Sequence, residues 1–178
     1  MVEYRILRID EAERIIEIDA THYIKNVWRR NEETGEYGLV EINWTDRELP
    51  NGFEWHLNRL KGTIMRGGTA FGCFDNGVLV GYGTVDREII GKQEKYVLLD
   101  QLFVSQNQRR KGIGKELFMM CAKQAKSYGA KKLFLCAGSA EGTIAFYRNL
   151  GCVPAIEINE ALYEEDPRDI QLEYSLNE

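Results

Sequence analysis

The sequence lacks several features that would assign it to a broad class of protein. It has no apolar run approaching the roughly 18 residues that a membrane-spanning helix requires, so no transmembrane helix is expected. Its charged N-terminus lacks the apolar core of a signal peptide. Four cysteines lie far apart among apolar neighbours, without a C-x-x-C pair: Cys73, Cys121, Cys136 and Cys152. This usage predicts buried, reduced thiols in a cytoplasmic protein.

Histidine is also scarce, and positive charge is outnumbered by negative charge. The 23 basic and 28 acidic side chains give a net charge of −5, which argues against general nucleic-acid binding. The two histidines, His22 and His56, fall in predicted helices without metal-ligand neighbours. We therefore interpret them as surface or packing residues and predict no metal site. With 44% hydrophobic residues, the chain can build a sizeable core, and residues 1–178 are predicted to form one domain.

Hydrophobic periodicity predicts a mixed α/β sheet. An Asp75-Asn76-Gly77 turn joins two strands, and a third strand completes an antiparallel meander. A helical crossover then requires strands 96–104 and 132–137 to be parallel. A terminal hairpin closes the sheet. The predicted elements are strand 3–8, helix 10–28 with an Asp10/Glu13 capping box, a short strand 39–44, helix 53–64, strands 69–74, 78–85 and 96–104, helix 112–128, strand 132–137, helix 141–149, and strands 152–158 and 170–176.

The chain is organised around the stretch from Lys95 to Gly151. A buried strand runs into a basic loop, and a helix begins at Gly112. The first amides of a helix have no partner within the helix, and its dipole adds partial positive charge there, so this layout predicts a phosphate-binding loop. Glycine allows the backbone to approach a ligand closely. Full positive charges surround the same point, on Arg109, Arg110, Lys111 and Lys115.

The glycine spacing distinguishes between phosphate ligands. Gly112-Ile113-Gly114 lacks the third glycine of the dinucleotide fingerprint, and no G-x-x-x-x-G-K-[ST] loop is present. The R-x-x-G-x-G run from Arg109 to Gly114 instead resembles the pyrophosphate loop of the GNAT superfamily of acetyl-CoA-dependent N-acetyltransferases. The downstream segment from Thr143 to Cys152 is similar to that family's A-x-x-[FL]-Y-x-x-x-G-F segment. The clear resemblance covers residues 95–156.

The resemblance implies where coenzyme A binds. The strands 96–104 and 132–137 would part, and backbone groups of Leu102, Phe103 and Val104 would bind the pantetheine arm. The loop from Arg109 to Lys115 would hold the pyrophosphate. Many relatives carry Asn where this chain has Ala140, so Ser139 is the substitute candidate for a cofactor contact.

The implied chemistry is direct attack of a neutral amine on the thioester carbonyl of acetyl-CoA. By resemblance, Tyr147 would protonate the leaving thiolate, with a core tyrosine as the alternative interpretation. Asp100 lies within an otherwise apolar strand, where a carboxylate is costly unless it is paired, hydrated or functional. We interpret it either as the general base or as a hydrogen-bonded structural residue, and Glu41 is the second candidate base.

None of these residues identifies the amine that accepts the acetyl group. The resemblance predicts an enzyme acting on the amine of a small molecule, amino acid or peptide, and because many relatives are dimers, a homodimer is one expected assembly. We expect no nucleic-acid or membrane partner. A non-catalytic acyl-CoA sensor is the alternative, and RNA binding through Arg109-Arg110-Lys111 is a third reading that lacks a wider basic patch. The aromatic-containing segment 29–50 is either a wall of the substrate site or local packing.

Overall fold

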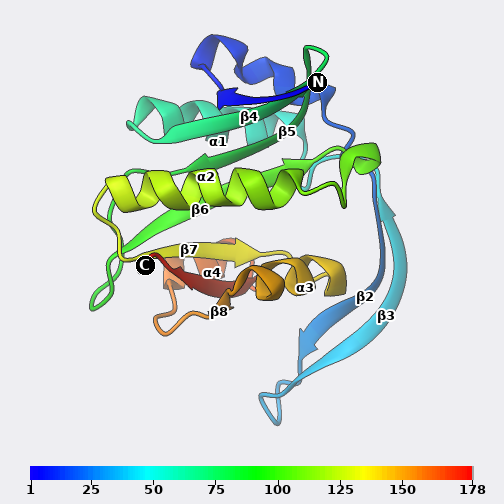
Figure 1. The fold of residues 1–178 in the computed structure, drawn as a ribbon. Coiled ribbons are helices and arrows are strands. Elements are labelled where there is room, and N and C mark those ends of the chain that lie inside the picture. The colour runs from blue at the N-terminus through cyan, green and yellow to red at the C-terminus, as the bar shows by residue number, and fades with distance from the viewer. Residues whose placement is uncertain (178) are drawn as a thin grey trace.

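The computed structural model describes residues 1–177, whose main feature is a seven-stranded mixed sheet with helices on both faces (Figure 1). The antiparallel meander, the parallel pair joined by a helix and the terminal hairpin are all present, which confirms the predicted fold class. In spatial order the strands are β1 (Val2–Ile6), β4 (Thr69–Asp75), β5 (Val78–Val85), β6 (Tyr96–Val104), β7 (Lys132–Ala137), β9 (Ile170–Ser175) and β8 (Val153–Pro154).

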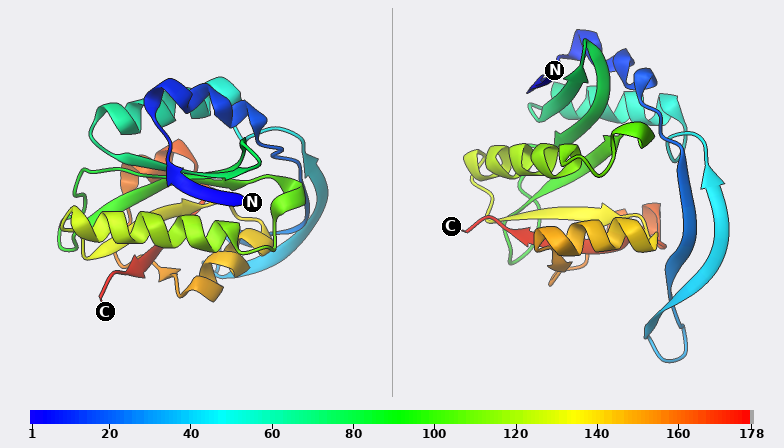
Figure 2. Two further views of the ribbon diagram at one scale, coloured as in Figure 1. Left: turned by 45° about the horizontal axis from the view of Figure 1, so that its top comes forward. Right: turned by 45° about the vertical axis from the view of Figure 1, so that its right-hand side comes forward.

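The helices divide between the two faces of this sheet, as the views in Figures 1 and 2 show. Helices α2 (Ile113–Ser127) and α3 (Glu141–Leu150) cover one face. The 3₁₀ helix η1 (Ile9–Glu17) and helices α1 (Phe53–Met65) and α4 (Glu160–Glu165) cover the other. Each face has its own apolar core, because apolar residues recur along α2 and α1 with a spacing of three and four.

The predicted helix 10–28 is wrong beyond its first half. Residues 9–17 form η1, and Glu11, not Glu13, accepts from the backbone N–H of Arg8 at its start. The chain then forms strand β2 (His22–Arg30). Along β2 itself no residue is inserted, and the register shift between Ile24 and Asn26 places the extra residue on its partner strand. Pairing with that partner strand therefore overrides the helix-like apolar spacing of this segment.

Strand β2 pairs with β3 (Tyr37–Asp46) in a separate two-stranded sheet. The predicted strand 39–44 lies within β3. This hairpin projects as a long arm at the end of the molecule where β6 and β7 finish (Figures 1 and 2). It contacts the segment between β7 and α3, where Trp28 N–H donates to the carbonyl of Ser139 at 2.8 Å and Val27 bridges Ala140.

Two smaller differences concern the C-terminal region. The predicted strand 152–158 is reduced to β8, and the acidic segment before β9 contains the short helix α4, which we had not predicted. Asn159 caps this helix by accepting from the backbone N–H of Leu162. No helix within residues 1–177 combines the length and apolar character needed to cross a membrane.

Candidate active site

The site begins where the parallel strands β6 and β7 part. They pair only along Tyr96–Leu98 and Lys132–Phe134, although β6 continues to Val104 and β7 to Ala137. The facing backbone edges beyond this point have no strand between them. An extended ligand can add to such an edge by main-chain hydrogen bonds. Leu102, Phe103 and Val104, the predicted arm-binding residues, lie along this open part of β6.

A bulge in β6 lies at the start of this gap. Thr84 pairs with Gln101 and Val85 pairs with Leu99, so Asp100 is the extra residue. The bulge changes which side chains face each side of the sheet. Leu99 packs in the core under α2, whereas Gln101 turns to the α1 side and donates to the ring of His56 at 2.9 Å. His56 is buried there and packs against Phe103, with ring centroids 5.0 Å apart.

The loop after β6 presents a run of free backbone amides. It contains the 3₁₀ turn η2 (Gln106–Gln108) and reverses direction through Arg110 and Gly112, whose φ angles are 61° and 86°. Alternation of such conformations turns consecutive N–H groups toward one point, as in anion-binding nests. Within residues 1–177, none of the amides from Arg110 to Lys115 donates to a backbone carbonyl, and the first intrahelical bond comes from Glu116 to Gly112. These amides are therefore available to an anion.

The two glycines of this loop differ in their surroundings, with close packing at one and open space at the other. A Cβ on Gly114 would lie 3.2 Å from Cζ of Phe146, whereas a Cβ on Gly112 would meet nothing within 4 Å. Gly114 is thus needed for the approach of α2 to α3, and Gly112 for its left-handed conformation. Ile113 is buried, so only its backbone faces the candidate anion site.

Arg109 is used differently from the other basic residues. Its Nε donates to the carbonyl of Val104 at 2.9 Å and its Nη1 to the carbonyl of Thr21 at 2.8 Å. Burial lowers the pKa of Arg109, and Asp19 opposes this effect. The side chain therefore fixes the loop to the start of β2. Lys111 contacts Gln108, and the chains of Arg110, Lys111 and Lys115 extend from the exposed side of the loop.

Tyr147 lies on α3 and packs its ring against Phe146 and Phe118, with centroids 5.1 and 6.2 Å away. No side chain or backbone group of residues 1–177 forms a hydrogen bond with its hydroxyl. Burial raises the pKa of Tyr147, with smaller contributions from Cys152, Cys121 and Asp169. The phenol is therefore protonated near neutral pH and retains its proton for donation.

Asp100 is held in an ion pair on the α1 side. Its two carboxylate oxygens lie 2.9 and 2.7 Å from Nε of Arg59, and Nη1 of Arg59 lies 2.5 Å from Glu165 of α4. The Asp100 side chain is only 8% exposed. Because the guanidinium occupies both oxygens, this carboxylate offers fewer free lone pairs than an unpaired one. Its role as a base stays a prediction.

Comparison with known proteins identifies the family of this chain. The profile described as "Acetyltransferase (GNAT) family" matches residues 25–152, well over half of the chain. The chain belongs to the GNAT acetyltransferase family. A search of curated proteins found no match.

Solved structures of other acetyltransferases share the fold of this GNAT acetyltransferase. Nourseothricin acetyltransferase has a TM-score of 0.74 at 19% identity, with 99% of each chain covered. The PaiA N-acetyltransferase of Thermoplasma acidophilum, in complex with coenzyme A, has a TM-score of 0.62 at 20% identity, covering 98% of this chain and 99% of that one. The ribosomal-protein-S18-alanine N-acetyltransferase of Escherichia coli has a TM-score of 0.61 at 14% identity, covering 100% and 96%.

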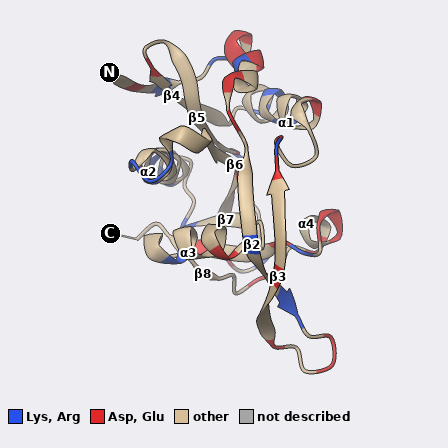
Figure 3. Ribbon diagram, turned by 90° about the vertical axis from the view of Figure 1, so that its right-hand side faces the viewer, with Lys and Arg blue, Asp and Glu red and all other residues tan. Residues whose placement is uncertain are grey.

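In this GNAT acetyltransferase the β2–β3 hairpin stands across the carboxyl ends of β6 and β7 (Figure 3). Arg29 on β2 donates to Oγ of Ser139 at 2.7 Å, so Ser139 is engaged by the hairpin while its own hydroxyl proton stays available. Glu41 lies on β3, exposed, and accepts from Asn43. The predicted wall segment thus occupies the mouth of the gap, and its contact with a substrate stays a prediction.

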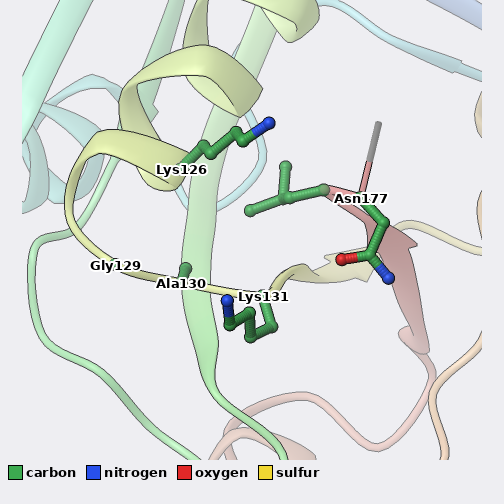
Figure 4. A pocket seen from close by; sticks show the side chains of 6 residues that line it. Lys126, Gly129, Ala130, Lys131 and Asn177 are labelled. Atoms are coloured by element: carbon green, nitrogen blue, oxygen red, sulfur yellow. The ribbon is translucent and has the colours of Figure 1, made fainter.

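A separate hollow of about 410 Å³ lies at the far end of α2 (Figure 4). It is lined by Lys126, Gly129, Ala130, Lys131, Leu176 and Asn177. It is open to solvent and lies beside the last turn of α2, where the helix dipole is negative. The free amides of the candidate site are at the other end of this helix, so the hollow is no part of that site.

Sequence reasoning missed two residues near the gap. Arg59, the partner of Asp100, lies 41 residues earlier in the chain, and nothing local to Asp100 indicates it. Asp169 lies between the two predicted terminal strands, directly before β9. Its signal was its place directly before a strand that pairs with β7.

Proposed function

We propose that this protein is an N-acetyltransferase that moves an acetyl group from acetyl-CoA to a primary amine by direct attack. The observation that carries this proposal is the run of free amides at the start of α2, placed beside the parted strands β6 and β7. A diphosphate is an anion that such amides and the helix dipole favour. The arm of the cofactor would extend from there along the open edge of β6.

In this proposal the residues have the following roles. Amides of Arg110 to Lys115 hold the diphosphate, with the charges of Arg110, Lys111 and Lys115 around it, while Arg109 holds the loop in shape. Backbone groups of Leu102, Phe103 and Val104 bind the arm, and Ser139 is a further contact at the end of β7. Tyr147 donates a proton to the sulfur as the C–S bond breaks.

The acceptor amine is proposed to reach the thioester from the α1 and α4 side, between the β2–β3 hairpin and the gap. Asp100 and Glu165 give this side carboxylates that suit a cationic amine. A structure similar over 99% of both chains is named for nourseothricin, so that antibiotic belongs first in a panel of amines. The panel also includes diamines, amino acids and peptides with free N-termini.

The test measures thiol release from acetyl-CoA in the presence of each amine, with mass spectrometry of the product. Amine-dependent release and a product heavier by one acetyl group support the proposal. Tight binding of coenzyme A by calorimetry without release on any amine favours the non-catalytic sensor instead. Absence of coenzyme A binding contradicts both functions.

A further inference from the structure

Asp169 lies at the end of the gap, next to the pair of strands β7 and β9 that forms its far edge. It directly precedes β9, whose first residue, Ile170, pairs with Ala137 at the end of β7. Along β9, Ile170 and Leu172 pack into the core on the α2 side. Side chains alternate along a strand, so Asp169 lies on the opposite side with Gln171. That is the side of α1 and α4, from which the amine is proposed to enter.

The carboxylate of Asp169 differs from the other acids near the gap because it has no partner among residues 1–177. Asp100 and Glu165 contact Arg59, and Glu173 contacts Lys132 at 2.8 Å. No cation or hydrogen-bond donor among residues 1–177 contacts the side chain of Asp169, which is half-buried. Its oxygens are therefore free to accept a proton from a ligand.

The charge of Asp169 affects the pKa values of two groups near the gap, Cys136 on β7 and Tyr147 on α3. Burial and then the charge of Asp169, ahead of that of Asp100, raise the pKa of the Cys136 thiol on β7 to about 12. Asp169 also contributes to the raised pKa of Tyr147 on α3. It is thus within electrostatic range of groups on both sides of the sheet, across the end of the gap.

The environment of Asp169 also sets its own proton affinity. Burial, followed by the charges of Asp166 and Glu165, raises the pKa of Asp169 to about 7. Asp100 and Arg59 act on the same Cys136 thiol and are the other charged groups on this side of the gap. A carboxylate poised near neutral pH can both take a proton and return it to solvent.

We infer that Asp169 is the general base of the acetyl transfer, while Asp100 serves as the counter-ion that positions Arg59. This inference rests on the proposed function. Asp169 takes one proton from the acceptor ammonium and leaves a neutral amine. The nitrogen lone pair then attacks the thioester carbon.

The remaining steps balance without another reactant. The C–N bond forms, the C–S bond breaks, and the sulfur takes the proton of Tyr147. The nitrogen loses its second proton, which restores the Tyr147 phenol. The proton on Asp169 leaves to solvent. The net reaction converts an ammonium and acetyl-CoA into an amide, the free thiol of coenzyme A and one proton.

The test compares kcat against pH for the wild type, D169N and D166N at saturating acetyl-CoA and amine. In the wild type, kcat should fall as the pH drops through about 7, because Asp169 becomes protonated. In D169N, kcat should fall about 100-fold or more, the range for loss of a general base, and this inflection should disappear. In D166N, the inflection should move to lower pH, because one of the charges that disfavour ionisation of Asp169 is gone.

Two further measurements separate the possible outcomes. Unchanged coenzyme A affinity and melting temperature in D169N show that the loss is chemical. An inflection that persists in D169N, or wild-type kcat in that variant, overturns Asp169 as the base while the acetyl transfer itself stands. A matched D100N variant that loses the inflection instead assigns the base to Asp100. A wild type without turnover on any amine removes the proposed function and this inference together.

Discussion

The two sides of the gap between β6 and β7 are built in different ways. The proposed cofactor end uses backbone amides from six consecutive residues, Arg110 to Lys115. The proposed acceptor side uses side chains from separate parts of the chain: Arg59 on α1, Asp100 on β6, Glu165 on α4 and Asp169 before β9. A backbone site tolerates many side chains but needs particular φ angles, whereas a side-chain site depends on each residue and on its partners.

This difference explains how one fold can keep a co-substrate and exchange acceptors. The amide run belongs to a single loop and helix start, so changes elsewhere leave it intact. Replacing one residue of the acceptor side alters charge, hydrogen bonding and shape at once. Four variants, in order of decreasing effect, separate the two sides.

The largest expected effect is on the rate of the chemical step, not on the binding of coenzyme A or of the acceptor amine. Tyr147→Phe should lower kcat by roughly 100-fold to 10,000-fold, because the thiolate would leave without its proton donor. Coenzyme A affinity should not change, since the ring still packs against Phe118. Tyr174→Phe is the matched control, because Tyr174 contacts the same Phe118 ring at 5.0 Å. Equal kcat values for the two variants would remove Tyr147 from the mechanism.

The next variant changes the proposed cofactor end of the gap, which is built from backbone amides. Gly112→Val should weaken coenzyme A binding by up to about 100-fold, because a β-branched residue at a φ of 86° distorts the nest at a cost of up to about 3 kcal/mol. Calorimetry measures the affinity. Gly129→Val, with a φ of 90° at the other end of α2 and similarly open space, carries the same strain. If both variants lose affinity equally, the effect is on stability and the phosphate site is misplaced.

The third variant changes the proposed acceptor side of the gap, which is built from side chains. Arg59→Leu leaves Asp100 buried and unpaired, which should destabilise the fold by about 3 kcal/mol, the lower end for a broken buried pair. Urea unfolding measures the change, and Asp100→Asn in the same chain should recover part of it. Lys61→Leu on α1 removes an exposed ion pair with Glu13 and should cost under about 1 kcal/mol. Equal losses in the free energy of unfolding for the Arg59 and Lys61 variants would show that the ion pair of Asp100 with Arg59 is not buried in solution.

The smallest effect is expected from a single exposed charge at the start of α2. Lys115→Gln should weaken coenzyme A binding only about twofold to fivefold, and less at high salt, because the amides carry most of the recognition. Lys123→Gln, two turns further along the same helix, is the control. A loss at Lys115 as large as that at Gly112 would mean that side-chain charge, not backbone, holds the diphosphate.

The sequence predicted the elements whose signals are local. Strands 69–74, 78–85 and 132–137 and the helix beginning near Gly112 were found because alternation, turn residues and helical spacing act over a few residues. Helix 10–28 was wrong because pairing with β3 and contacts with Ser139 stabilise β2 as a strand, against the helix-like spacing of its apolar residues. Those contacts join residues more than 100 positions apart.

The candidate site also has a part that local sequence predicts and a part that it does not. The order of glycines and basic residues in a single loop was enough to predict an anion site, because the amides of a helix start depend on neighbours along the chain. Only the tertiary structure decided that Arg109 holds the loop, that Arg59 neutralises Asp100 and that Asp169 has no partner within residues 1–177. Such pairings follow from the distances between side chains in the folded protein, and residues far apart in sequence carry no local mark of them.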